Sequence, residues 1–204
     1  MDNIRFLENF TSLINGCSES DRHRICSSAN QNQRRSKTWL FDRLVKHTER
    51  VQYDTITVIG GWYGLLMLPL ISERLITKSV VFIDKDEHAI NIAEKIFSGC
   101  LPFTCTFLCE DVFLNPARFS NKSSDLIINT SCEHMIDMSY LTIPQKTVVA
   151  VQSANTDAQR DPDHTNPCSS EAELVTKTGL NEVFYSGAKM LQPDKTRFLA
   201  IGTR

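Results

Sequence analysis

The loop expected after residues 124–129 carries side chains suited to proton transfer. His134 lies beside Glu133 there, and histidine is the side chain that most readily exchanges protons near neutral pH. We expect His134 to act as a general base and Glu133 to orient its imidazole ring. The alternative is a structural role, which is more common for a single histidine.

Other polar side chains follow the ends of adjacent predicted strands or lie in the loop after them. Carboxamides, hydroxyls and imidazoles can hold a polar substrate by hydrogen bonds. The alternative is that they only cap turns and loops. The candidates are Asn129, Ser131, Gln152, Ser153, Asn155, His164 and Asn166.

No metal site is expected from the sequence. The candidate ligands of a structural zinc ion are Cys105, Cys109, Cys132 and His134. Cys105 and Cys109 lie along one predicted strand, and the sequence contains no Cys-x-x-Cys pair of the kind that binds zinc. A magnesium site would require several carboxylates at strand ends, and Glu133 is the only one near the fourth predicted strand.

A glycine-rich turn follows the first predicted strand. The β-branched run 56–59 is typical of a strand buried on both faces. Gly60, Gly61 and Gly64 come next, and glycine lets the backbone turn tightly and approach a ligand because it has no Cβ. A strand, a glycine turn and a helix from Leu65 onward can hold a nucleotide-like ligand. The alternative is a plain strand-to-helix turn.

A carboxylate ends the second predicted strand. Asp84 lies 20 residues after Gly64 (84 − 64), close to the spacing of an acid that binds ribose hydroxyls. A carboxylate can accept a hydrogen bond from both hydroxyls of a ribose. The alternative is a helix N-cap, although Asp86 can fill that role instead.

An acidic pair follows the third predicted strand. Glu110 and Asp111 can accept a hydrogen bond from an adenine amino group, and Val112 and Phe113 can flank the ring. The alternative is a turn with solvated acids.

Strands and helices alternate along most of the chain. Residues 88–97 and 170–178 are predicted helices, and 156–168 is a polar loop. Only about eight residues separate the last two strands, too few for a helical crossover, so these strands should form an antiparallel hairpin. The expected strands are 56–59, 79–84, 104–109, 124–129, 148–153, 182–187 and 196–202.

The N-terminal segment, residues 1–49, is expected to form a helical cap. Residues 1–16 have apolar side chains at helical spacing, 17–36 are polar and indicate a loop or lid, and Ser36 is an expected N-cap for a helix over 37–45. Basic residues cluster in this segment. They indicate a solvated face or, alternatively, contact with an acidic substrate or a nucleic acid.

Composition places few further limits on function. The chain has 204 residues, a net charge of −2 and 41% hydrophobic residues, which is ordinary for one globular domain. No apolar run reaches the ~20 residues needed to span a bilayer. The start of the chain lacks a secretory signal pattern, and the seven cysteines are expected to be reduced thiols. We expect a cytoplasmic monomer or homodimer without membrane association.

The chain resembles class I S-adenosylmethionine-dependent methyltransferases over residues 50–204. The resemblance implies an α/β fold: a doubly wound, seven-stranded, mostly parallel sheet with a C-terminal antiparallel hairpin and helices on both faces. It implies S-adenosylmethionine as cofactor and methyl transfer to a polar nitrogen or oxygen acceptor. Asn129 resembles the start of the motif that faces the transferable methyl group. The implied cofactor-binding residues are Gly60, Gly61, Trp62, Tyr63, Gly64, Asp84, Glu110, Asp111, Val112 and Asn129.

Two motifs depart from the usual family pattern. The glycine motif is Gly-Gly-Trp-Tyr-Gly, and Trp62 and Tyr63 either wall the ligand site or pack under the cap. The motif after the fourth strand differs from that of DNA amino-methylating enzymes. The acceptor is therefore unidentified. The alternatives are an RNA or DNA methyltransferase, a non-catalytic cofactor-binding module and a nicotinamide-dependent oxidoreductase, against which the terminal hairpin argues.

Overall fold

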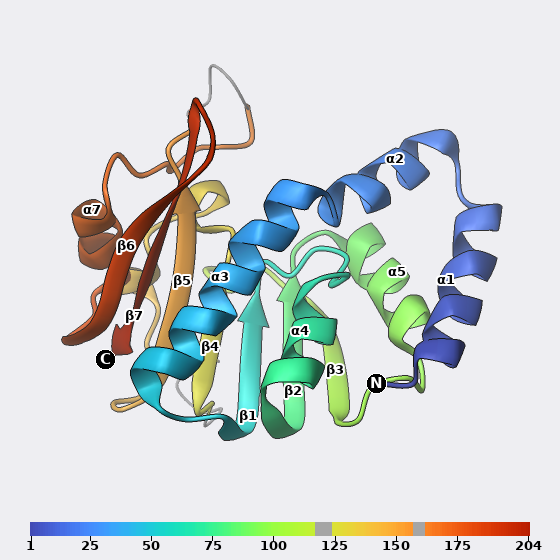
Figure 1. Cartoon of the computed structure of the whole chain (residues 1–204), viewed down its shortest axis with the longest axis horizontal. Helices are drawn as coiled ribbons and strands as arrows, with labels where there is room; N and C mark the ends of the chain where they lie inside the picture. The colour runs from blue at the N-terminus through green and yellow to red at the C-terminus, as the bar shows by residue number, and fades with distance from the viewer. Residues whose placement is uncertain (117–123, 157–161) are drawn as a thin grey trace.

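The computed structural model describes residues 1–116, 124–156 and 162–204, and contains one seven-stranded sheet (Figure 1). The strand order is β3-β2-β1-β4-β5-β7-β6. The strands are β1 (Gln52–Ile59), β2 (Ile76–Asp84), β3 (Thr104–Cys109), β4 (Leu126–Asn129), β5 (Val148–Ala154), β6 (Glu182–Gln192) and β7 (Lys195–Thr203).

The strand directions match the expected fold class. Strands β1 to β5 pair in parallel, whereas β7 runs antiparallel to both β5 and β6. Because only two residues connect β6 to β7, these strands can pair only as a hairpin. Each of the seven strands predicted from the sequence is present, and β1 and β6 extend by about four residues beyond the predicted ranges.

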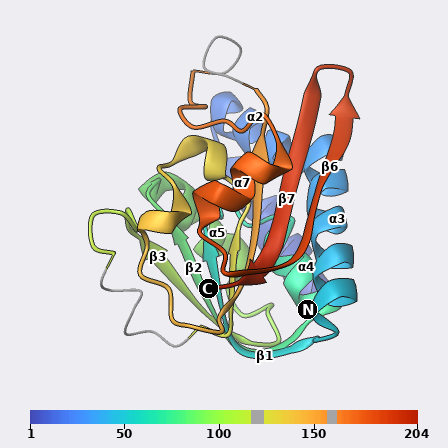
Figure 2. The same ribbon diagram turned by 90° about the vertical axis from the view of Figure 1, so that its left-hand side faces the viewer.

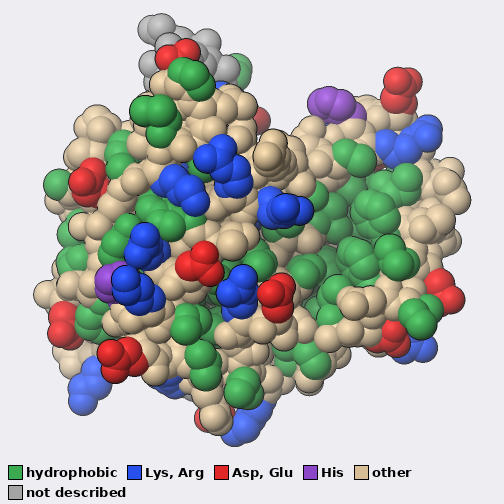
Figure 3. All heavy atoms as spheres, viewed as in Figure 1, with side chains coloured by type: hydrophobic (Ala, Val, Ile, Leu, Met, Phe, Trp, Pro, Cys, Tyr) green, Lys and Arg blue, Asp and Glu red, His purple; other side chains and the backbone are tan. Residues whose placement is uncertain are grey.

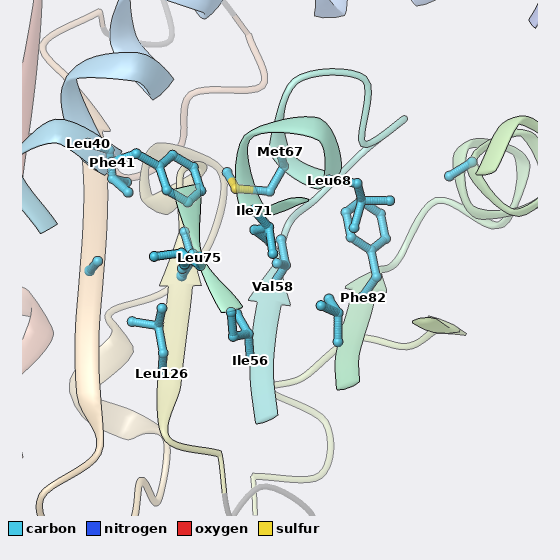
Figure 4. Packing of buried hydrophobic residues seen from close by; sticks show 14 of the residues in the cluster. Leu40, Phe41, Ile56, Val58, Met67, Leu68, Ile71, Leu75, Phe82 and Leu126 are labelled. Carbon is cyan, nitrogen blue, oxygen red and sulfur yellow. The ribbon is translucent and has the colours of Figure 1, made fainter. Parts of the chain in front are cut away.

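One face of the sheet is covered by α3 (Gln31–Thr48), α4 (Met67–Arg74) and α5 (Glu87–Phe97). Figure 4 shows Phe41 of α3 and Ile71 of α4 over the strands, with Val58, Phe82 and Leu126 beneath them. All five side chains are at most 1% exposed. This core holds β1 and β2 rigidly, and their carboxyl ends carry the glycine turn and Asp84.

The other face is covered by α7 (Glu171–Thr178), the short helices η1 (Cys132–His134) and η2 (Met138–Tyr140), and their loops. Figure 2 shows α7 on the side of the sheet opposite to α3 and α4. Leu174 of α7 and Met138 of η2 pack with Val149 and Val151 of β5. The predicted α7 is capped as expected, because Ser170 accepts from the Glu173 amide and Gly179 ends the helix in the left-handed region.

The prediction of a loop over residues 17–36 is wrong. The segment forms α2 (Glu19–Ser28) and the first turns of α3, which follow α1 (Asn3–Gly16) in an arc over the sheet (Figure 1). Ser18 and Asn30 cap these helices with their side chains. Their apolar periodicity is weak because α2 and the start of α3 bury few residues, so the pattern used for the prediction was absent.

Ser36 is therefore not the expected N-cap but lies within α3. Its hydroxyl donates to Gln152 Oε1 at 2.9 Å, and Gln152 Nε2 donates back to the Ser36 carbonyl at 3.0 Å. Since both side chains are buried, this reciprocal pair fixes α3 against β5. The division between a cap (1–49) and a catalytic domain (50–204) stays a prediction, and α3 shares one hydrophobic core with the sheet.

In the described parts of the chain, none of the helices combines the length and hydrophobicity needed to cross a bilayer. Hydrophobic side chains gather on the side of the molecule that carries α1, α2 and α5 (Figure 3). Of the predicted polar loop 156–168, residues 157–161 lie outside the described residues.

Candidate functional site

The glycine turn after β1 is held in an unusual backbone conformation. Gly60 and Gly64 have φ values of 64° and 68°, and Trp62 between them has φ 51°. A positive φ is rare for a tryptophan and costs about 1–3 kcal/mol, so such outliers tend to occur at functional sites. The amides of Gly60 and Gly61 donate to the Ile83 carbonyl at 2.9 and 3.3 Å, which fixes the turn against the end of β2.

The glycines also allow close approach of neighbouring elements. A Cβ on Gly60 would lie 3.0 Å from Ser131 Cβ, and a Cβ on Gly61 would lie 2.2 Å from the Phe82 ring. The Ser131 hydroxyl donates to the Gly60 carbonyl at 3.1 Å. The turn after β1 and the loop after β4 are therefore in direct contact and form one wall.

Asp84 ends β2 beside this turn. Its Oδ2 accepts from the Trp62 amide at 2.7 Å and its Oδ1 from the Asp86 amide at 3.0 Å. Asp86, rather than Asp84, caps α5 by accepting from the Ala89 amide. A carboxylate has about four lone-pair positions, so Asp84 keeps acceptor capacity for further donors while holding Trp62 in place.

The acidic pair lies next to Asp84. Glu110 donates its amide to the Asp84 carbonyl at 2.9 Å, so the ends of β2 and β3 are adjacent. Asp111 is exposed and accepts from the Phe113 amide at 3.0 Å. Val112 is 6% exposed and packs in the core of the α7 face.

A cavity of about 100 Å³ lies between the glycine turn, the loop after β4 and α3. Its lining includes seven of the predicted site residues. They are Gly60, Gly61, Trp62, Gly64, Ser131, Glu133 and His134. A whole ligand usually occupies roughly 300–1,000 Å³, so this cavity fits one end of a ligand.

Trp62 and Tyr63 separate at this point. Trp62 lines the cavity, whereas Tyr63 is fully buried in the core under α2, with the Arg24 guanidinium 6.0 Å from its ring centroid. The two rings lie 4.8 Å apart. Trp62 is therefore placed as a wall of the cavity, whereas Tyr63 packs beneath the N-terminal helices.

Glu133 forms a buried ion pair with Arg197 of β7, instead of orienting His134. Its Oε1 accepts from Arg197 Nη1. The two side chains are 2% and 11% exposed. Within the described residues, Glu133 Oε2 is buried and has no hydrogen-bond partner. Removal of either partner would leave the other charge buried and uncompensated.

His134 is oriented by the backbone. Its Nδ1 lies 3.0 Å from the Asp163 carbonyl, and its ring meets the His164 ring edge-on at 4.6 Å. His164 Nδ1 lies 2.8 Å from the Thr156 carbonyl. Loops after β4 and β5 thus bring two imidazoles together beside Glu133.

Lys37 of α3 reaches the same cavity. Its ammonium donates to Gln33 Oε1 at 2.6 Å. Burial, and next the positive charge of Arg197, lower the pKa of Lys37 to about 7, although the charge of Glu133 acts in the opposite direction. A substantial fraction of this side chain is therefore a neutral amine at physiological pH.

This shift predicts a pH dependence of stability. The folded chain releases the Lys37 proton near pH 7, whereas the unfolded chain holds it up to about pH 10.5. The free energy of unfolding should therefore rise with pH between about 7 and 10.5, by up to about 1.4 kcal/mol per pH unit. This gain is lost as the pH falls back through 7. Lys37→Met removes the group, so urea denaturation from pH 6 to 9 should show wild type gaining stability relative to the variant.

Lys95→Met, at an exposed lysine of α5, provides the matched control. It should keep the wild-type pH dependence. A constant free-energy difference between wild type and Lys37→Met at all pH values would contradict the assigned shift.

The comparisons with known proteins support the strand topology. No protein-family model and no curated protein matches the chain. Magnesium protoporphyrin IX methyltransferase (ChlM) from Synechocystis PCC 6803, solved with bound SAH, is similar with a TM-score of 0.59 and 12% identity, over 85% of this chain and 83% of its own. The CurJ carbon methyltransferase is similar with a TM-score of 0.52 and 16% identity, over 76% of this chain. The chain spans 50% of the CurJ structure.

The chain has the class I methyltransferase fold. A third similar structure is a MtNAS mutant in complex with S-adenosylmethionine, with a TM-score of 0.56 and 12% identity. The match covers 98% of this chain and 72% of MtNAS, so it includes most of α1 to α3. A complex of MtNAS with MTA and tNA is similar over 97% of the chain, with a TM-score of 0.55.

The side chains of several predicted substrate-binding or catalytic residues form hydrogen bonds within the protein. Asn129 is fully buried; its Oδ1 accepts from the Ser131 amide at 2.9 Å and its Nδ2 contacts the sulfurs of Met135 and Met138. Gln152 bonds Ser36, as described above, and Asn155 accepts from the Thr196 amide at 2.9 Å. Asn129 and Asn155 thus hold loops in place and Gln152 holds α3. None of the three, nor the fully buried Ser153, lines the cavity.

Two charged cavity residues were missed as site residues from the sequence. Arg197 lies within the last predicted strand, where nothing in the local pattern distinguishes it. Lys37 belongs to the basic cluster of the N-terminal segment, in which the sequence does not distinguish it from its neighbours. Neither carries a local signal, because both reach the cavity only through packing of α3 and β7 on the sheet.

Proposed function

We propose that the protein binds S-adenosylmethionine and transfers its methyl group to a polar acceptor. The observation that carries this proposal is the junction of Asp84 with the glycine turn. The carboxylate at the end of β2 fixes the left-handed Trp62, next to a cavity that continues along Gly60 and Gly61 to the loop after β4. In α/β sheets this edge is where nucleotide ligands bind.

The residues of this edge fit such a ligand. Asp84 has acceptor positions left for ribose hydroxyls. Glu110 and Asp111 follow the neighbouring strand end, and in this proposal they would accept from the base. Gly60 and Gly61 line the cavity, so their backbone is exposed to the amino-acid part of the ligand. The cavity beside Ser131 and His134 would then face the acceptor.

The bound sulfonium supplies an electrophilic methyl carbon. The acceptor's lone pair forms the new bond to that carbon as the carbon–sulfur bond breaks, with its electron pair left on sulfur, and the acceptor's proton passes to a base. Two cavity side chains can accept that proton. They are His134, through Nε2, and Lys37 in its neutral form.

Calorimetry with S-adenosylhomocysteine tests this proposal directly. We expect saturable binding at one site per chain and thermal stabilisation by S-adenosylmethionine, because a ligand that binds only the folded state raises its stability. NADH is the matched control ligand. Stabilisation by NADH without stabilisation by S-adenosylmethionine would reject the proposal in favour of an oxidoreductase.

A second candidate is transfer of a different carbon group from the same sulfonium. It is favoured by the coverage of the MtNAS structures, which extends through the N-terminal helices, and by the MTA present in one of them. The nucleoside product separates the two reactions. Methyl transfer leaves S-adenosylhomocysteine, and transfer of the aminocarboxypropyl group leaves methylthioadenosine.

The nucleic-acid acceptor and the non-catalytic binding module stay predictions from the sequence. Arg24 pairs with Asp86 at 2.9 Å, Arg35 donates to the Leu191 carbonyl at 3.1 Å, and Lys37 lines the cavity. These basic residues are thus engaged at three separate places. Labelling of RNA or DNA by a tritiated methyl group would support the nucleic-acid alternative; cofactor binding without turnover across a broad acceptor panel would favour the module.

A further inference from the structure

Three side chains with metal-binding atoms meet beside the cavity. They are Glu133, His134 and His164, and one ligand atom from each lies within 4.8 Å of the others. Glu133 and His134 come from the loop after β4, whereas His164 comes from the loop after β5. Since no local sequence pattern links these loops, the cluster exists only in the folded chain.

Both imidazoles are oriented as metal ligands are. His134 Nδ1 lies 3.0 Å from the Asp163 carbonyl, and His164 Nδ1 lies 2.8 Å from the Thr156 carbonyl. A carbonyl oxygen only accepts hydrogen bonds, so Nδ1 carries the proton and Nε2 the lone pair in each neutral ring. A hydrogen bond from the other ring nitrogen to a carbonyl is the usual way in which proteins orient a metal-binding histidine.

The carboxylate supplies an independent observation. Glu133 is 2% exposed, and its Oε2 has no hydrogen-bond partner within the described part of the chain. Arg197 occupies only the other oxygen, Oε1. A buried, unsatisfied carboxylate oxygen is costly, and a cation at Oε2 would remove that cost.

The two loops are fastened to each other. The Asn166 amide donates to the Glu133 carbonyl at 2.9 Å, and Asn166 Nδ2 donates to the Met135 carbonyl at 2.9 Å. Lys177 of α7 donates to Asn166 Oδ1 at 2.8 Å. Asn166 thus holds His164 and His134 at a fixed separation, as a preorganised site requires.

We propose that Glu133, His134 and His164 bind one divalent transition-metal ion. Two imidazoles and one carboxylate suit zinc, manganese, iron(II) or cobalt(II). Metal–ligand bonds of about 2.1 Å allow two ligand atoms to lie at most about 4.2 Å apart. The widest pair, at up to 4.8 Å, would therefore have to close by at least about 0.6 Å when the ion binds. Glu133 would bridge the ion at Oε2 and Arg197 at Oε1.

The ion would bind and activate the methyl acceptor. Three protein ligands leave coordination positions open, and Glu133 and His134 line the cavity. Resting on the proposed function, an acceptor oxygen or nitrogen that binds the ion becomes more acidic and loses its proton more readily. The ion would take the lone pair of His134, which would leave Lys37, on the same cavity, as the side chain placed to accept this proton.

Metal binding to the full chain, freed of metal by a chelator and dialysis, tests the inference. Manganese(II) is the affinity probe, because it prefers nitrogen and oxygen to the free thiols, and cobalt(II) is the spectroscopic probe. We expect one ion per chain and cobalt absorption bands without thiolate charge transfer. His134→Gln and His164→Gln should each weaken manganese binding at least about 100-fold.

His23→Gln, at an exposed histidine of α2, is the matched control and should bind manganese as wild type does. Circular dichroism identifies a variant that fails to fold, and the other histidine variant then decides. Absence of manganese binding, or binding that both variants retain, would overturn the site. Metal binding without S-adenosylhomocysteine binding would keep this inference and reject the proposed function.

Discussion

Arg197→Met is expected to lower the free energy of unfolding by about 3–5 kcal/mol, the usual cost of removing one partner from a buried ion pair. Glu133 is 2% exposed, and Arg197 is the hydrogen-bond partner of its Oε1, while Oε2 is unpartnered in the described regions. In the variant both carboxylate oxygens would be buried without a partner. Urea denaturation at pH 7.5, with the midpoint and slope fitted together, measures the change.

The double variant Glu133→Met/Arg197→Met distinguishes charge from packing. It removes the carboxylate as well, so it should be more stable than Arg197→Met alone, since a buried pair replaced by apolar side chains is often near neutral in stability. Lys78→Met, at the exposed ion pair with Asp54, is the control and should leave the free energy of unfolding close to that of wild type. Equal stability of the single and double variants would mean that Glu133 carries no uncompensated charge.

Asp84→Ala is expected to weaken S-adenosylhomocysteine binding by at least about 100-fold. Hydrogen bonds to a charged group contribute about 1.5–3 kcal/mol each, and about 1.4 kcal/mol corresponds to a tenfold change in affinity. The substitution removes the proposed ribose acceptor, and it also removes the oxygen that holds the Trp62 amide at 2.7 Å. Isothermal titration calorimetry measures the loss.

Asp84→Asn separates these two effects. Its carboxamide oxygen can still accept from Trp62, so the turn should persist, while the charge toward the ribose is lost and binding stays weak. Asp54 is an exposed aspartate near the start of β1. Since β1 and β2 run in parallel, it lies at the opposite edge of the sheet from Asp84, and Asp54→Ala should bind as wild type does. Wild-type affinity in Asp84→Ala would remove Asp84 from the cofactor site.

The fold could be predicted because its signals are local. The β-branched runs, the glycines after residue 59 and the short connection expected between the last two strands each restrict the backbone within a few residues. The positive φ at Gly60 and Gly64 shows why glycine stands there. The helices at 19–28 and 31–36 escaped prediction since their exposed, polar surfaces lack apolar periodicity, although Ser18 and Asn30 were available as caps.

The sequence by itself determined the α/β sheet, the glycine turn and the acids that end β2 and follow β3. Only the tertiary structure decided which charged groups meet at the cavity. Glu133 and Arg197 are 64 residues apart, His134 and His164 come from different loops, and Lys37 belongs to a helix before the first strand. Such encounters depend on how β7 and α3 pack beside the sheet. Local periodicity records which face of an element is buried, and it contains no information on the partner that a buried charge will find.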